Sequence, residues 1–280
     1  MVKGTKAIWE ANQLDEPASY VDAHIHLDKY TVEERDRLLE EAFREGVATV
    51  VAVSMDLASS KINAELARRY PGSVHPAYGF HPEQEPPSAQ ERERLLTWIR
   101  ERHTAGEAFA IGEVGLPYYM RTEREAAGKT FDETAHLELL ESFVRLAAEL
   151  DCPIVLHAVY EDADKAYELL RRYNVSSAHF HWFKGSMQTV ERLIEAGYFI
   201  SLTPDVVYEP EIIALAKRYP LELMMTETDG PWPHEGPFAG QSTKPPMVKR
   251  VAAEIARLKG LPLAEAETAL LRNAKRFYRI

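Results

Sequence analysis

Cysteine and long hydrophobic runs are what this sequence has least of. Cys152 is its single cysteine, which excludes an intrachain disulfide and fits a reducing compartment. No stretch approaches the ~20 apolar residues that a membrane-spanning helix needs, and the polar segment 1–16 has no apolar core typical of a secretory signal peptide. We therefore expect a cytoplasmic protein with no membrane contact.

Positive charge is also scarce. The 33 lysine and arginine residues are outnumbered by 44 aspartate and glutamate residues, so the net charge is −11. This balance argues against a protein whose main task is to grip nucleic acid phosphates with a wide basic face. It leaves open an enzyme that meets phosphates through bound cations, because the cations cancel local negative charge. Nothing in the sequence indicates an obligate protein partner.

Short apolar runs alternate with amphipathic stretches along the whole chain. The runs are rich in Val, Ile or aromatic residues and predict eight strands: Tyr20–His26, Val47–Ser54, Val74–Gly79, Phe109–Glu113, Cys152–His157, Ser177–Trp182, Tyr198–Leu202 and Leu223–Thr228. The amphipathic stretches predict helices: Val32–Glu45, Ala58–Tyr70, Glu91–His103, Asp132–Leu150, Asp162–Tyr173, Met187–Ala196, Glu209–Tyr219, Lys244–Leu258 and Leu263–Phe277.

This alternation predicts an α/β fold, a (β/α)8 TIM barrel of parallel strands with an extra C-terminal helix. A doubly wound sheet is the alternative, but the sequence has no glycine-rich phosphate-binding motif after the first strand. No linker or change of composition divides the chain. We therefore expect one domain over residues 1–280.

Histidines and carboxylates recur at the predicted strand ends, where barrel enzymes place their chemistry. They come from five different strands: His24, His26, Glu113, His157, His181 and Asp229. His24 and His26 are two apart in a strand and should point the same way. By contrast, His103 and His136 lie in helical patterns and His234 in a loop, and we interpret these three as surface or packing residues.

Imidazole and carboxylate groups are the usual ligands of zinc, manganese, iron or nickel. Burying all six side chains without partners would cost several kcal/mol. Six ligands are too many for one tetrahedral ion that keeps an open position. The sequence therefore predicts two divalent ions (zinc, magnesium or manganese), ~3.5–4 Å apart, that share Glu113 and activate water for hydrolysis.

Six segments at or near these strand ends form an ordered series: Asp22–His26, Gly79–Pro82, Ile111–Leu116, His157, His181–Ser186 and Glu227–Trp232. In this order, and over nearly the whole chain, they resemble the TatD family of metal-dependent hydrolases in the amidohydrolase superfamily. The resemblance implies that His24, His26, Glu113 and Asp229 hold one metal ion. It also implies that Glu113, His157 and His181 hold the second, with His179 left to a core or supporting role.

Two positions depart from the pattern of this family. Pro117 stands where the family usually has aspartate, and Val159 stands where it usually has an arginine that grips phosphate. Lys184 is a candidate to replace part of the lost charge, although a solvated loop lysine is the alternative. His81 is a candidate to contact substrate oxygens, although it also suits a simple turn before Pro82.

The resemblance implies a TatD-type deoxyribonuclease-like hydrolase that cleaves phosphodiester bonds with water activated by two metal ions. Asp229 would accept the proton of that water and pass it to the leaving group. One alternative is a hydrolase of small carboxylic esters, lactones or amides, which the net charge and Val159 favour. Another is a non-catalytic binding protein, which the complete set of six ligands disfavours. The expected substrate is thus a nucleic acid or a small molecule.

Overall fold

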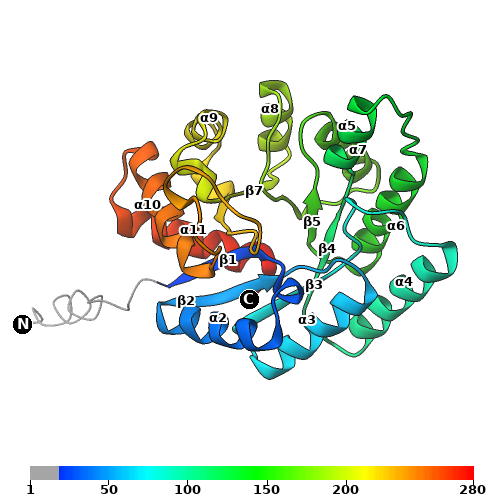
Figure 1. Ribbon diagram of the computed structural model, residues 1–280, viewed down its shortest axis with the longest axis horizontal. Helices are drawn as coiled ribbons and strands as arrows, with labels where there is room; N and C mark the ends of the chain where they lie inside the picture. The colour runs from blue at the N-terminus through cyan, green and yellow to red at the C-terminus, as the bar shows by residue number, and fades with distance from the viewer. Residues whose placement is uncertain (1–18) are drawn as a thin grey trace, which may run out of the picture.

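The computed structural model describes residues 19–280, so the expectation for segment 1–16 lies outside the described residues. Eight parallel strands follow one another around a barrel in chain order (Figure 1). Their bounds are β1 Tyr20–Ile25, β2 Val47–Ala52, β3 Val74–Tyr78, β4 Ala110–Gly115, β5 Ile154–His157, β6 Ala178–Phe180, β7 Phe199–Leu202 and β8 Met224–Thr226.

The barrel closes where the segment after β8 meets β1. The backbone N–H of Asp229 donates a hydrogen bond of 2.9 Å to the carbonyl oxygen of His24. The N–H of His26 donates one of 2.8 Å to the carbonyl oxygen of Gly230. The predicted (β/α)8 barrel is therefore confirmed.

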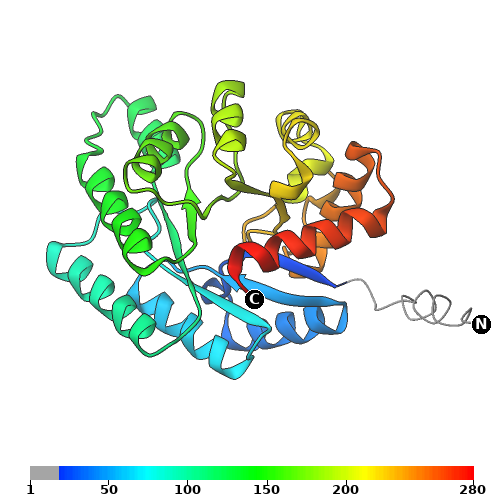
Figure 2. The same cartoon turned by 180° about the vertical axis from the view of Figure 1, so that it is seen from behind.

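Helices cover the outside of the strands. Their bounds are α2 Val32–Arg44, α3 Leu57–Arg69, α4 Ala89–Thr104, α5 Tyr118–Ala126, α6 Thr134–Leu150, α7 Glu161–Arg172, α8 Met187–Glu195, α9 Pro210–Arg218, α10 Val248–Lys259 and α11 Leu263–Tyr278. The last of these is the expected extra helix, and Figure 2 shows it lying across β1. Its Tyr278 hydroxyl donates a 2.9 Å hydrogen bond to the carbonyl oxygen of Ala23.

Among residues 19–280, no helix is both long and apolar enough to cross a membrane.

Local side-chain chemistry explains where the helices depart from the predicted bounds. Helix α4 begins at Ala89, earlier than predicted, because Ser88 and Glu91 form a reciprocal capping box. Helix α10 begins only at Val248, because Pro245–Met247 form a short 3-10 turn first. Helix α5 was not predicted at all. None of its residues is buried, so it does not contribute to the apolar core.

Small and apolar side chains fill the barrel interior. Residues from seven strands and α11 form this cluster: Val21, Ala23, Val51, Val53, Ala77, Ala110, Val155, Phe199, Met225, Ala274, Phe277 and Tyr278. A larger apolar layer lies between the strands and the surrounding helices. The interior is thus a packed core, and it supports polar side chains at the carboxyl ends of the strands.

Candidate metal centre

Irregular pairing in β1 turns two histidines toward the barrel axis. Val21 and Ala23 pack in the interior, so strict alternation would place His24 on the outer face. The register of β1 against β2 shifts after Asp22. Beyond that shift His24 and His26 both turn inward. The sequence spacing predicts that the two rings share a direction, but the shift that sets this direction is visible only in the structure.

Glu113 reaches the same place through a second irregularity. The register of β4 against β5 shifts between Ile111 and Val114. Just beyond, a Cβ atom at Gly115 would lie 1.8 Å from the carbonyl oxygen of His157. Only glycine allows the two strands to approach so closely, and this approach places the Glu113 and His157 side chains together.

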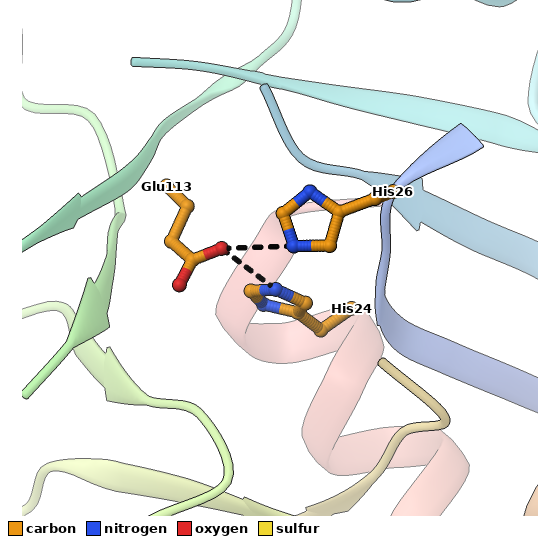
Figure 3. Close-up of side chains that lie close together, drawn as sticks. All are labelled: His24, His26 and Glu113. Atoms are coloured by element: carbon orange, nitrogen blue, oxygen red, sulfur yellow. Dashed lines mark ion pairs between the residues drawn. The ribbon is translucent and has the colours of Figure 1, made fainter. Parts of the chain in front are cut away.

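One oxygen of the Glu113 carboxylate faces the two histidines of β1. Its Oε2 lies 3.0 Å from Nε2 of His24 and 3.2 Å from Nε2 of His26. Figure 3 marks these two pairs with dashed lines. The Oδ1 atom of Asp229 lies 3.4 Å from each of the same two nitrogens. These four side chains are buried and form the first group of donors.

The other oxygen of Glu113 faces a different set of histidines. Its Oε1 lies 2.9 Å from Nδ1 of His157 and 2.7 Å from Nε2 of His181. Nε2 of His81 is slightly farther away, at 3.5 Å. The structure thus brings together all six side chains that the sequence nominates as ligands, and Glu113 divides its oxygens between two groups.

Several of these donor atoms have no ordinary partner. Nε2 of His24, Oε2 of Glu113 and Oδ1 of Asp229 are buried and lack a hydrogen bond within residues 19–280. Such atoms are costly to bury unless something else satisfies them. Ligands bound to one ion at about 2.1 Å lie roughly 3.0–3.4 Å from each other, which matches the spacing found here. The residues present therefore fit divalent metal ions.

The pKa shifts of His24, His26 and Glu113 show how burial and neighbouring charges act on the proposed ligands. Burial and the neighbouring His181 ring lower the pKa of His24 well below its ordinary value. Burial would lower the pKa of His26 too, but the neighbouring carboxylates of Asp229 and Glu113 raise it to about 10. Burial alone would raise the pKa of Glu113, but the surrounding imidazoles hold it well below its usual range. The carboxylate therefore stays ionised.

Glu227, which the sequence did not nominate, lies directly behind the centre. Its Oε1 accepts a 2.6 Å hydrogen bond from the backbone N–H of Trp182, and its Oε2 accepts one from the Ser201 hydroxyl. Nδ1 of His181 is 3.8 Å from Oε1. Because both oxygens already have protein donors, we interpret Glu227 as a support for His181 rather than a ligand. The same Ser201 hydroxyl contacts His179, which also meets Tyr278 in the interior.

The remaining histidines have different environments. His103 is exposed, and His136 is buried with its Nε2 3.2 Å from the carbonyl oxygen of Gln84. His234 is more central than its loop position suggested. Its Nδ1 lies 2.9 Å from Oδ1 of Asp205, and its Nε2 lies 2.9 Å from the carbonyl oxygen of Thr228, next to Asp229 in the chain.

A cavity of about 420 Å³ opens onto the second group of donors. Its lining residues are His81, Glu83, Tyr119, His157, His181, Trp182, Asp229, Trp232 and Pro233. Sequence reasoning did not nominate Glu83, Tyr119 or the two tryptophans, although both tryptophans lie in quoted motifs. Lys184 is half-buried, with its ammonium group 5.6 Å from the centre of the Trp182 ring. Val159 is buried and does not line this cavity.

Comparison with known proteins gives one consistent result. A family model described as "TatD related DNase" matches residues 21–279. A Haemophilus influenzae protein described as an uncharacterized metal-dependent hydrolase is 38% identical, covering 92% of this chain and 99% of that protein. Human deoxyribonuclease TATDN3 is 28% identical, covering 92% of this chain and 94% of the relative. The crystal structure of the Escherichia coli TatD homologue YJJV superposes with a TM-score of 0.79 at 26% identity, covering 94% and 99% of the two chains.

Proposed function

Because the chain belongs to the TatD family and is a metal-dependent hydrolase, we propose that it cleaves phosphodiester bonds of DNA with the help of two divalent ions. The observation that carries the two-ion proposal is the division of the Glu113 oxygens between two groups of histidines. A relative of similar length is named a deoxyribonuclease, which supports the choice of substrate.

Each proposed ion has its own set of ligands. His24, His26 and Asp229 would hold one ion together with Oε2 of Glu113. His157 and His181 would hold the other together with Oε1. When bound, such ions polarise a phosphoryl oxygen and lower the pKa of a nearby water.

Asp229 is placed to move the proton of the attacking water. Its carboxylate lines the cavity, and its backbone N–H is fixed by the hydrogen bond to His24. The residue has a φ of 53°, in the left-handed region that aspartate and asparagine tolerate better than most residues. We assign this carboxylate the task of accepting the proton and passing it to the leaving oxygen.

His81 is placed to hold the substrate. The backbone N–H of Glu83 donates a 3.2 Å hydrogen bond to Nδ1 of His81. Since Nδ1 then acts as an acceptor, a neutral ring carries its proton on Nε2, which faces the centre. That N–H would donate to a phosphate oxygen. Tyr119, Trp182 and Trp232 offer ring faces on which bases would stack, with Lys184 beside Trp182.

A metal add-back assay tests this function. The protein is stripped with a chelator, reloaded with Mg²⁺, Mn²⁺ or Zn²⁺, and given labelled single-stranded DNA and a panel of small esters and lactones. We expect nucleotide release from DNA that depends on added metal and disappears in the variant with His24→Ala and His26→Ala. Turnover of the ester panel with intact DNA would contradict the proposal and favour the small-molecule alternative.

A further inference from the structure

Glu83 connects the cavity wall to a histidine of the centre. It lies in the loop between β3 and α4, and its Oε1 is 3.2 Å from Nε2 of His157. The same carboxylate accepts the backbone N–H groups of Tyr119 over 2.9 Å and of Met120 over 2.7 Å. Those two N–H groups belong to the first turn of α5. Glu83 thus receives three donors, one of which is the ring of His157.

We propose that Glu83 is a positioning residue that sets which nitrogen of His157 faces Glu113. This inference rests on the function proposed above, in which His157 is a ligand of the second ion. An ionised carboxylate accepts hydrogen bonds and cannot donate them, so Nε2 of His157 must carry a proton. A neutral ring then presents the lone pair of Nδ1, the atom that lies 2.9 Å from Oε1 of Glu113.

The surroundings keep the Glu83 carboxylate ionised. Two backbone N–H groups at the start of α5 donate to it, over 2.9 Å and 2.7 Å, and such hydrogen bonds favour the ionised form of a carboxylate. A fixed negative charge in a cavity that receives phosphate is unfavourable for binding. We infer that the control of His157 compensates for this cost.

The neighbouring ring provides an internal comparison. The backbone N–H of Glu83 donates to Nδ1 of His81, so this ring has the same tautomer as His157, but a backbone donor sets it instead of the Glu83 side chain. A change of the Glu83 side chain leaves this backbone donor in place. Substitution should therefore affect His157 and spare His81, which a general loosening of the loop would not do.

The test uses Glu83→Gln. An amide has one acceptor oxygen, so any orientation of this side chain points its NH2 group at His157 or at the N–H groups of α5. Facing His157, the amide favours a proton on Nδ1, the wrong atom for a ligand. Glu85→Gln is the matched control. It removes the same charge two residues away, where the carboxylate is 72% exposed and contacts Arg124 of α5 instead.

Two measurements, one of metal affinity and one of histidine protonation, test this expectation and do not depend on enzymatic activity. In a Mn²⁺ titration we expect Glu83→Gln to keep the first equivalent and to bind the second 10–100-fold more weakly, as loss of such a carboxylate typically does. In ¹⁵N correlation spectra of the Zn²⁺-loaded Glu83→Gln variant, we expect a proton on Nδ1 of His157. We expect the protonation of the His81 ring to be the same as in the wild type. Glu85→Gln should match the wild type in both. If Glu83→Gln does not fold, Glu83→Ala gives the same comparison.

Wild-type affinity for both equivalents in the variant, or an equal loss of both, would overturn the inference. A wild-type protein that binds two equivalents but cleaves no DNA contradicts only the substrate proposed above. A wild-type protein that binds one equivalent contradicts the two-ion proposal and this inference together.

Discussion

His24 and His181 lie face to face, with ring centroids 3.8 Å apart and ring planes 12° apart. One ring comes from β1 and the other follows β6. Their Nε2 atoms approach different oxygens of Glu113, at 3.0 Å and 2.7 Å. The two groups of donors therefore meet at the stacked rings, and the Glu113 carboxylate faces one group with each of its oxygens.

This arrangement predicts different metal losses for two variants. Glu113→Gln replaces the shared carboxylate with a neutral amide, so we expect both equivalents of metal to bind at least 10-fold more weakly. His157→Ala removes a ligand from one group, so we expect loss of one equivalent only. Elemental analysis after gel filtration measures both. His103→Ala, at an exposed histidine, is the control, and identical losses in the two test variants would refute the shared position of Glu113.

The assignment of Asp229 as proton acceptor predicts a selective loss of turnover. Asp229→Asn keeps the shape and the tolerance for positive φ but removes a base, so we expect kcat on DNA to fall about 100-fold or more. KM should change much less. Asp151→Asn is the matched control, because Asp151 also has a positive φ, of 49°, and does not line the cavity. Near wild-type kcat in Asp229→Asn would remove the assignment.

Trp232 predicts a loss of substrate affinity. Its side chain is 41% exposed although it lines the cavity, which leaves a ring face free for a base. Stacking on an aromatic ring contributes about 1–3 kcal/mol per base. We expect Trp232→Ala to raise KM for single-stranded DNA by roughly 5- to 100-fold with a smaller effect on kcat. Leu263→Ala, at another exposed apolar residue, should leave KM unchanged. A Trp232→Ala enzyme with wild-type KM would exclude stacking here.

His75 predicts a dependence of stability on pH. It is 5% exposed in β3, and burial lowers its pKa to about 4. The unfolded chain binds a proton on this residue at higher pH, near 6.5, so between pH 6.5 and 4 the unfolded state holds more protons than the folded state. The stabilisation is complete above pH 6.5 and is lost as the pH falls toward 4.

We expect the wild type to lose about 1.6 kcal/mol of unfolding free energy relative to His75→Leu between pH 6.5 and 5. Urea unfolding of the metal-free proteins at the two pH values measures this difference and avoids acid release of metal. His103→Leu should show no such difference from the wild type. Parallel pH profiles for the wild type and His75→Leu would show that His75 does not titrate in this way.

The strand order and the six donor residues follow from the sequence because both depend on local patterns. A parallel barrel places every strand end on one face, so histidines and carboxylates at those ends must converge. Glu83 escaped prediction because it lies in a loop, and its role depends on contacts with α5, a helix with no buried residues that the sequence did not predict. The register shifts in β1 and β4 could not be predicted from the sequence either, because such a shift depends on how neighbouring strands pair.

His234 illustrates the same limit. A histidine in a loop is usually solvated, and nothing near it in the sequence suggests otherwise. Its partner Asp205 is supplied by the turn after β7. His234 and Asp205 come together only when the barrel closes, so a local pattern of residues in the sequence does not predict their contact.

The junction between the first and last strands has a consequence for biosynthesis. His24 and His26 leave the ribosome early, while Asp229, whose backbone closes the barrel against His24, is added near the end. At about 5–20 residues per second, the roughly 200 intervening residues take about 10–40 s to translate. During that interval the nascent chain exposes an incomplete set of the proposed metal ligands. Ion capture and barrel closure are therefore expected to be post-translational events, and a chain released before Asp229 can complete neither.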